Sequence, residues 1–541
     1  MKAKKILILS LVALITVSFS FQSRFFEIAK QIEIYNNLFK TLNMNYVDEI
    51  NPGDLTNKAI NNTLKNLDPY TRFYNEQQME DALIRREGEY GGIGISSFYT
   101  KKGIVVADIK EGYPADKAGL KAGDVIFNVN GQNIGGLEDD QLSQMLKGSP
   151  NTPVNLKVKR AEKTIPFDLT LDKIMMDPVP FYEMINEDTG YIILTQFTNY
   201  KATEGVTKAF KELKEKGMKK LVFDLRNNPG GSLYDAVNIT NLFIPMGKKV
   251  VDTRGKSKKN SRTYNTSRSP LDLEMPMVVL INGRSASASE IVSGALQDYD
   301  RAVIMGERSF GKGLVQRYFK LNYGTQMKAT ISKYYTPSGR CIQELDYANR
   351  DAKTGGVPKF SDGIVNKFST ENGRPVLDGG GVLPDVKIDI SEKTAETNRL
   401  LNSKAIFNFA TEYARKNPSI NLDTFTFSSS DFNQFKEYLI TKDTTFTSQQ
   451  EKLFITAYES EENNSKISSE YNHLITKLKS LKIAEITKNE DLLTSLLQDE
   501  IIERYFYKKG VYQYQLKNDI AIKKASELLN NNNKYNNFLG K

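Results

Sequence analysis

Three serines alternate with two alanines where an apolar run gives way to a helical pattern, in the stretch INGRSASASEIVSGAL at residues 281–296. A serine at a strand-to-helix turn is exposed, and the helix N–H groups beside it can stabilise an oxyanion. The stretch therefore offers a nucleophile for acyl transfer. It also fits a capping box, in which Ser287 caps the helix and Glu290 reaches back to the N–H of the cap residue. Both interpretations stay open until a base is identified.

The choice of base is narrow, because the 541 residues include one histidine and one cysteine. His473 lies in a charged helical stretch far downstream and is interpreted as a solvated residue on a helix face. Cys341 has no partner for a disulfide and no evident base. A zinc site of histidine and cysteine ligands is excluded by count, and we expect neither a metal nor a cofactor. A catalytic serine here would need a lysine or a carboxylate as its base.

Lys312 lies in GERSFGKG, residues 306–313, which is nearly a phosphate-binding P-loop. Gly313 stands where a P-loop has the Ser or Thr that holds Mg²⁺, and the following LVQRYFKL alternates like a strand rather than a helix. A lysine between two glycines can instead approach the start of a neighbouring helix and act as a general base. Its pKa would have to fall from about 10.4 by roughly 3, which requires about 4 kcal/mol and is attainable by burial.

The net charge of +9 is interpreted as a generic solvated surface, because Lys and Glu are interspersed. We find no basic stripe with interleaved aromatic residues and no nucleic-acid motif, so no nucleic-acid partner is expected. At the N-terminus, MKAKK precedes an apolar run at residues 6–21, which has the length of a signal peptide and is slightly short for a membrane span. This predicts export to the periplasm or to the periplasmic face of the inner membrane. Residues 1–22 would be either cleaved or kept as a membrane tether.

The spacing of apolar residues and the turn residues predict four regions in the remaining chain. Residues 23–86 have helical spacing. Residues 87–173 are rich in strand patterns, with strands at GIVVADI and VNLKVKR, a helix at EDDQLSQML and an Asn130-Gly131 hairpin turn. Residues 174–395 alternate strands and helices, which indicates a βαβ core. Residues 396–541 are mostly helical and end in NNNNKYNNFLGK, which we expect to be frayed.

The strand-rich region resembles a PDZ domain of the bacterial protease type, through YGGIGI and VVADIKEGYPADKAGLKAGDVIFNVNGQNIGGL. The resemblance implies that the loop from Gly91 to Gly94 offers backbone N–H groups to the C-terminal carboxylate of a peptide. Successive N–H groups in a glycine turn form an anion-binding nest, and the next strand then pairs with the peptide. The predicted contacts are Gly91, Gly92, Ile93, Gly94 and Ile95. A hairpin turn without a ligand is the alternative.

Several motifs stand in the order found in the C-terminal processing peptidases, the tail-specific serine proteases of family S41. They are DLRNNPGG, NGRSASASEIVSGALQD, GERSFGKGLVQ, YYTPSGRCIQ and GGGVLPDV, and the resemblance covers roughly residues 67–390. It implies a ClpP/crotonase-like protease core with a Ser-Lys dyad, in which Ser287 is the nucleophile and Lys312 the base. Gln316 would orient the lysine, since positions 312 and 316 share a face of a strand. The resemblance, and not the chemistry, selects Ser287 over Ser285 and Ser289.

By the same resemblance, the N–H of Ala288 and the turn Gly230-Gly231 form the oxyanion hole, although a simple strand end would also account for the glycines. Glu290 and Asp298 are interpreted as structural. Cys341 replaces the serine expected in this family, a conservative change.

The predicted fold class is multidomain α+β and α/β: a PDZ-like module and a βαβ-rich protease core, with helical flanks at both ends. The predicted function is a serine endopeptidase of the cell envelope that recognises free C-termini of protein or peptide substrates. The alternative is a catalytically inactive PDZ scaffold on a protease-like fold. The helical flanks would suit a homodimer, and a solvated cap around the core fits them equally well.

Overall fold

The structure is a computed structural model that describes residues 25–76, 78–79, 89–198, 200–351, 353–363, 365–388, 392–461 and 464–541. The chain divides into two compact units, residues 1–76 with 317–330, and residues 77–316 with 331–541. The predicted signal or anchor at residues 1–22 lies outside the described residues. Within the described part of the chain, no helix combines the length and the apolar character of a membrane span.

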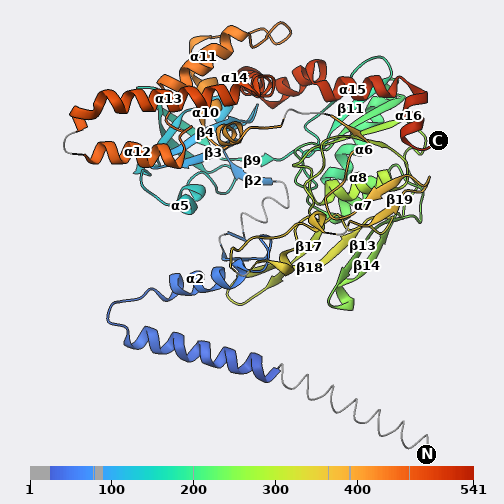
Figure 1. Ribbon diagram of the computed structural model, residues 1–541, viewed down its shortest axis with the longest axis horizontal. Helices are drawn as coiled ribbons and strands as arrows, with labels where there is room; N and C mark the ends of the chain where they lie inside the picture. The colour runs from blue at the N-terminus through green and yellow to red at the C-terminus, as the bar shows by residue number, and fades with distance from the viewer. Residues whose placement is uncertain are drawn as a thin grey trace, which may run out of the picture. The chain divides into compact units, whose positions relative to one another are not determined.

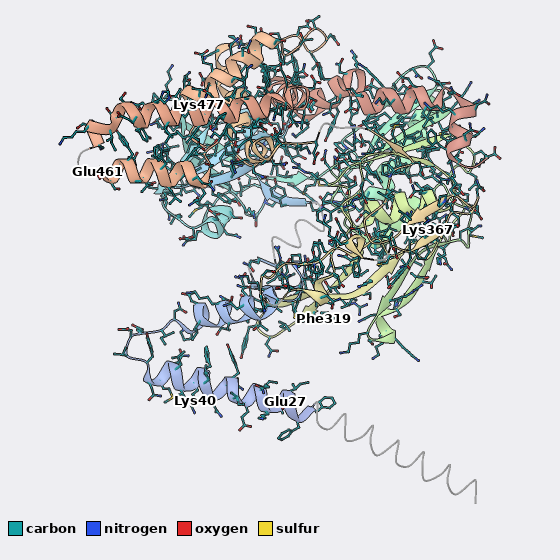
Figure 2. All side chains as sticks on the ribbon, in the orientation of Figure 1. Glu27, Lys40, Phe319, Lys367, Glu461 and Lys477 are labelled. Carbon is teal, nitrogen blue, oxygen red and sulfur yellow. The ribbon has the colours of Figure 1, made fainter. Side chains whose placement is uncertain are left out.

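The first unit begins with a helix at residues 25–45, whose side chains are nearly all exposed (Figure 2). Helix α2 (Pro52–Lys65) follows. Within the region predicted to be helical, the chain breaks at Asp68, which accepts the N–H groups of Tyr70 and Thr71 and turns the chain into a strand. Residues 76 and 78–79 are helical again, and residues 80–86 of the predicted region lie outside the described residues. This strand, β1 (Arg72–Tyr74), pairs antiparallel with residues 326–328 of β18 (Gln326–Tyr335).

The PDZ-like module of the second unit has a sheet in the order β3-β4-β5-β7-β8, which leaves β3 at an edge. The predicted strands, helix and hairpin are confirmed, and Asn130 (φ 50°) and Gly131 (φ 83°) form the turn. Val106, Ile126 and Val158 are fully buried in its core. The elements are β2 (Glu89–Gly92), β3 (Ile95–Thr100), β4 (Gly103–Ile109), α4 (Pro114–Ala118), β5 (Val125–Val129), β6 (Gln132–Asn133), α5 (Asp139–Gln144), β7 (Pro153–Arg160), β8 (Lys163–Thr170) and β9 (Asp172–Met175).

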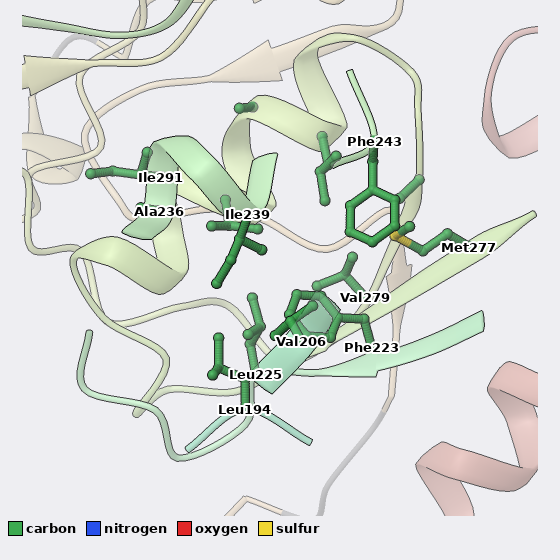
Figure 3. Packing of buried hydrophobic residues seen from close by; sticks show 14 of the residues in the cluster. Leu194, Val206, Phe223, Leu225, Ala236, Ile239, Phe243, Met277, Val279 and Ile291 are labelled. Carbon is green, nitrogen blue, oxygen red and sulfur yellow. The ribbon is translucent and has the colours of Figure 1, made fainter. Parts of the chain in front are cut away.

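The protease core is built on a six-stranded sheet in the order β10-β11-β12-β15-β16-β21, parallel except for β10. Its strands are β10 (Phe181–Met184), β11 (Thr189–Ile193), β12 (Lys220–Asp224), β15 (Met277–Ile281), β16 (Val303–Gly306) and β21 (Val386–Lys387). Helices α6 (Lys201–Glu215), α7 (Leu233–Asn241) and α8 (Ala288–Asp298) cover one face. Val206, Phe223 and Val279 pack together in this layer (Figure 3).

The C-terminal end of the chain covers the opposite face of the same sheet. Helices α15 (Ile520–Leu529) and α16 (Asn532–Phe538) pack on the alternate side chains of the strands, including Val222, Val278 and Leu280. The expectation of a frayed end is wrong, because Tyr535 is 5% exposed and its hydroxyl accepts the N–H of Met277 at 2.9 Å. The extension thus completes a sheet buried on both faces, as parallel sheets require.

The remaining helices of the extension are α9 (Ala395–Leu401), α10 (Ala405–Lys416), α11 (Ser429–Thr441), α12 (Gln449–Ser460), α13 (Ser468–Thr487) and α14 (Glu490–Asn518), which kinks at Tyr507. All of them except α12 contribute to a separate apolar cluster around residues such as Phe409, Phe432 and Phe435. His473 is exposed on α13, as predicted. Outside these helices lie the hairpin β13 (Lys249–Gly255) and β14 (Arg262–Asn265), the strand β17 (Leu314–Lys320), and the pair β19 (Lys367–Ser369) and β20 (Pro375–Leu377).

Candidate active site

Ser287 occupies the turn between the buried strand β15 and the buried helix α8. It is the N-cap residue of α8, and its backbone adopts φ 57° and ψ −110°, a conformation that costs a non-glycine residue free energy. Such strain persists where surrounding structure imposes it, and it is concentrated at functional sites. The side chain is half-buried, so its hydroxyl is within reach of a ligand.

The structure separates the three serines that chemistry alone left equivalent. Ser285 and Ser289 are 0% exposed, and each hydroxyl donates to a backbone carbonyl: Ser285 to Leu225 at 2.8 Å, and Ser289 to Asn228 at 2.9 Å. Both serines therefore tie the turn to the loop that follows β12. Ser287 is the one of the three that is open to a substrate.

Glu290 is the residue that sequence reasoning undervalued. Its carboxylate is fully buried, and one oxygen accepts the N–H of Ser287 at 2.7 Å and the N–H of Lys312 at 3.0 Å. The other oxygen accepts the Ser309 hydroxyl at 2.6 Å and the Gly311 N–H at 2.7 Å. One side chain therefore holds the backbones of the predicted nucleophile and the predicted base. The signal in the sequence was the capping-box spacing, which gave the contact to residue 287 but not the contact to residue 312.

Of the two side-chain hydrogen bonds of a capping box, the one accepted by the Glu290 carboxylate from the Ser287 N–H is formed. The Glu290 N–H donates to the Ser287 carbonyl oxygen at 2.9 Å, and the Ser287 hydroxyl makes no cap hydrogen bond. Burial raises the pKa of Glu290 above its usual 4.5, and the hydrogen bonds from Ser309, Gly311, Ser287 and Lys312 oppose that rise. Three of the four partners are backbone N–H groups, which can only donate, and this arrangement suits the ionised carboxylate.

Lys312 lies in the turn between β16 and β17, held on both sides. The Gly311 N–H is bound by Glu290, and the Gly313 N–H donates to Gln343 Oε1 at 2.8 Å. Gly311 has φ 85°, and a Cβ there would come within 2.7 Å of the Glu344 Cβ. The loop does approach the start of a neighbouring helix, as predicted. β17 is a strand, so the P-loop interpretation fails for want of a following helix, and the described residues contain no cluster of metal ligands.

Gln316 is half-buried on β17, four residues beyond Lys312. Lys312 precedes β17, which begins at Leu314, so the prediction that the two residues share a strand face is wrong. The orienting role of Gln316 stays a prediction.

The glycine turn after β12 lies directly against the nucleophile. A Cβ on Gly230 would lie 2.8 Å from the Ala288 nitrogen and 2.8 Å from the Ser287 Cβ. The Gly230 N–H, which was predicted to line the oxyanion hole, instead donates to Asn228 Oδ1 at 2.9 Å. Gly230 thus keeps the space beside Ala288 open rather than supplying a donor. Within the described part of the chain, the N–H groups of Ala288 and Gly231 have no acceptor, which leaves these two as the candidate donors.

The turn itself is anchored deep in the core. Asn228 is fully buried, and its side-chain amide donates to the Leu194 carbonyl at 2.8 Å. Upstream, Arg226 binds Asp224 at 2.7 Å and Asp519 at 2.8 Å. Asp519 is the N-cap of α15, so the C-terminal extension holds the loop that carries one candidate oxyanion donor, Gly231.

Three of the five predicted peptide-binding residues of the PDZ-like module, Ile93, Gly94 and Ile95, line a groove. Edge strand β3 and helix α5 flank a cavity of about 200 Å³, lined by Ile93, Ile95, Leu142, Leu146 and other residues. Gly91 and Gly92 are not part of an open turn, because they lie in β2 and pair with Lys173 and Asp172 of β9. Of the residues predicted to form the nest, Ile93 and Gly94 (φ 83°) lie outside this strand pairing, and their N–H groups have no acceptor among the described residues.

Comparison with known proteins agrees with this architecture. Family models match "Peptidase family S41" at residues 188–349, "PDZ domain" at residues 105–160, and "Probable PDZ-protease, C-terminal helical domain" at residues 396–529. A carboxy-terminal-processing protease of Bartonella bacilliformis is 35% identical over 320 residues, which is 58% of this chain and 73% of the relative. A probable CtpA-like serine protease of Staphylococcus aureus is 35% identical over 311 residues, 57% of this chain and 61% of its own length. Among solved structures, a photosystem II D1 C-terminal processing protease has a TM-score of 0.36 and 28% identity, over 66% of this chain and 92% of that one.

The fold and the matches define a serine peptidase whose core is joined to a PDZ domain. The chain belongs to peptidase family S41, the C-terminal processing peptidases. The predicted fold class, a multidomain α+β protein with a helical C-terminal domain, is confirmed.

Proposed function

We propose that this peptidase is an endopeptidase that cleaves substrates with a Ser287–Lys312 dyad. The observation that carries the proposal is the Glu290 carboxylate oxygen that accepts N–H groups from both residues, at 2.7 Å and 3.0 Å. Fixing a nucleophile and a base on a common support lowers the entropy cost of bringing them into reacting geometry.

In the proposed reaction, neutral Lys312 takes the proton of the Ser287 hydroxyl as the oxygen attacks the scissile carbonyl. The N–H groups of Ala288 and Gly231 bind the resulting oxyanion. The lysine then gives its proton to the leaving amine as the peptide bond breaks, which leaves an acyl-enzyme. A water molecule, deprotonated by the same lysine, hydrolyses the ester and restores the serine.

The PDZ groove supplies substrate capture. Its short nest at Ile93 and Gly94 offers N–H groups to a terminal carboxylate, and the free edge of β3 can pair with the preceding residues. Ile95, Leu142 and Leu146 line the cavity with apolar surface for the last side chain. A matched pair of peptides, one with a free C-terminus and one amidated, tests this step. We expect kcat/KM to fall on amidation, and equal values would contradict tail recognition.

Export to the cell envelope remains a prediction from the N-terminal sequence, as do a tether through residues 6–21 and a homodimer. The helix at residues 25–45 has the apolar surface that a partner would cover, since Phe25, Phe26 and Leu38 are 71%, 69% and 59% exposed.

Ser287→Ala tests the proposed nucleophile. We expect cleavage of a peptide with a free apolar C-terminus to be lost, because the covalent route is removed, while the melting temperature changes little. The matched control is Ser428→Ala, which removes the N-cap serine of α11 and costs about 1 kcal/mol of capping without touching the site. Full activity of Ser287→Ala would overturn the assignment. A wild-type chain that binds tails and never cleaves them would favour the PDZ scaffold.

A further inference from the structure

The positive charge of this protein is concentrated in one hairpin. Residues 247–269 contain eight lysine and arginine residues and one aspartate, so they hold a net charge of +7 out of the +9 of the whole chain. The interpretation of the charge as evenly interspersed is therefore wrong. The segment comprises β13, a turn and β14, and it extends away from the six-stranded sheet (Figure 1).

The cations differ between the base and the end of this hairpin. At the base, Lys248 binds Glu371 at 2.7 Å and Lys249 lies 3.4 Å from Asp252. The end of the hairpin, residues 255–263, is named here the basic tip. Its four cations are all exposed, and no carboxylate among the described residues lies within 4.0 Å of them: Lys256, Lys258, Lys259 and Arg262. Long side chains project from this end in Figure 2.

The backbone of the basic tip is held in place by hydrogen bonds. Ser261 accepts the Gly255 N–H at 3.1 Å, and the Asn260 carbonyl accepts the hydroxyl of Ser332 at 2.7 Å and that of Thr253 at 3.2 Å. A Cβ on Gly255 would lie 2.4 Å from the Ile331 carbonyl oxygen, so the turn packs closely on β18. The four charges are therefore presented on a fixed turn and not on a loose loop.

Protection of a sheet edge does not explain the basic tip. Edge strands are often blunted by lysine, and β14 is the edge of its sheet. However, three of the four cations lie in the turn before β14, and only Arg262 belongs to the strand. The tip also lacks the aromatic side chains that stack on bases in single-stranded nucleic acid.

We propose that the basic tip binds an anionic lipid surface through its phosphate groups. Four cations at the end of a projecting turn can approach a plane of phosphates together, whereas a peptide would need a groove around it. The tip has no apolar side chain between residues 255 and 263, so it would bind by charge at the headgroup level without insertion.

The test measures binding of the full chain to two kinds of vesicle, phosphatidylcholine alone and phosphatidylcholine with about 30% phosphatidylglycerol, by co-sedimentation at low salt. An apolar N-terminal segment can insert into both, so the measured quantity is the ratio of the two affinities. Each cation near an anionic surface contributes up to about fivefold in affinity. We expect the wild-type ratio to be at least about tenfold, and to approach one near 1 M salt, where the Debye length is about 3 Å.

A variant with Lys256→Gln, Lys258→Gln, Lys259→Gln and Arg262→Gln should bring the ratio close to one. The matched control removes four exposed lysines that have no carboxylate partner among the described residues, through Lys157→Gln, Lys163→Gln, Lys523→Gln and Lys524→Gln. It should keep the wild-type ratio, and thermal melts verify the fold of both variants.

Four results would overturn the proposal. A wild-type ratio near one, which needs no variant, would show that the lipid charge is not sensed. An equal loss in the two quadruple variants would assign the effect to overall charge. If polyglutamate competes the protein off the sedimented vesicles, but added phosphatidylglycerol vesicles of equal charge do not, the partner is an acidic protein instead. Soluble glycerol phosphate should displace no more protein than sodium chloride at equal ionic strength, and stronger displacement would indicate a site for a free phosphate.

Discussion

Glu290 in the protease core and Glu503 in α14 are both buried carboxylates, yet their surroundings differ. Glu290 accepts four hydrogen bonds, which come from the nucleophile turn and from the lysine loop. Glu503 is 8% exposed and binds Lys508, and its Oε1 atom has no hydrogen-bond partner among the described residues. Burial, more than any neighbour, raises the pKa of Glu503 to about 7, and the nearby Asp108 carboxylate raises it further.

The difference lies in the supply of donors and not in the depth of burial. A carboxylate with all its lone pairs occupied by N–H and O–H groups is a fixed support, because protonation would place a hydrogen against donors. A carboxylate with a vacant oxygen beside another carboxylate gains a partner when it takes up a proton. Glu290 therefore serves geometry, while Glu503, at the contact of α14 with β4, responds to pH near neutrality.

Replacing the lysine that Glu290 supports should have the largest effect. We expect Lys312→Arg to lose activity nearly as completely as Lys312→Ala, because arginine keeps the charge but cannot act as a base. The wild-type kcat/KM should rise with pH through the ionisation of the lysine. Peptide cleavage at several pH values measures both. Substantial activity in the arginine variant would make Lys312 an electrostatic residue, and the role of Glu290 would then be structural alone.

Glu290→Gln should have an intermediate effect. The glutamine NH₂ group must face two of the four donors, so one pair of hydrogen bonds is lost, at a cost of about 1–3 kcal/mol. If the bond to Ser287 or Lys312 is weakened, kcat should fall about 10- to 100-fold while KM changes little. The control is Glu451→Gln, since Glu451 is also buried, at 4% exposed, and also closes a capping box, with Ser448 on α12. Equal losses of kcat in the two variants would reduce Glu290 to a stabilising residue.

Lowering the pH tests Glu290 independently, because we expect catalytic activity to fall while the contribution of this group to folding stability rises. The folded pKa is raised above the usual 4.5, so this group contributes stability that is present at low pH and is lost as the pH rises through its folded pKa. Activity, in contrast, should fall as the pH drops through that pKa, because the protonated group no longer supports both N–H groups.

The sequence predicted the parts of the site that depend on local pattern. The strand-turn-helix at Ser287, the glycines around Lys312 and the Asn130-Gly131 hairpin are each specified within a few residues. Contacts between distant segments were missed, because they depend on the folded sheet: the bond of Glu290 to Lys312, the use of the Gly230 N–H by Asn228, and the packing of Tyr535 against β15. The charge of the basic tip can be read from the sequence, but the net charge of the whole chain does not show where the cations lie.

Glu503→Gln should have the smallest effect, and it tests whether the second buried carboxylate, Glu503, responds to pH. The folded pKa of about 7 lies above the usual 4.5, so this group stabilises the fold at low pH and loses that contribution as the pH rises through about 7. The bond to Lys508 already contributes to this pKa, so the raised pKa alone sets the loss, which we expect to be about 2–3 kcal/mol between pH 5 and pH 8.

The glutamine variant should therefore melt at a higher temperature than the wild type at pH 8 and at nearly the same temperature at pH 5. Glu527→Gln, on the exposed face of α15, removes an equal charge and should leave the pH profile of melting unchanged. A Glu503→Gln variant that keeps the wild-type pH profile would mean that the Lys508 bond holds the carboxylate ionised throughout. In that case the vacant oxygen at the contact with β4 would have no part in sensing pH, and Glu503 would be a fixed support like Glu290.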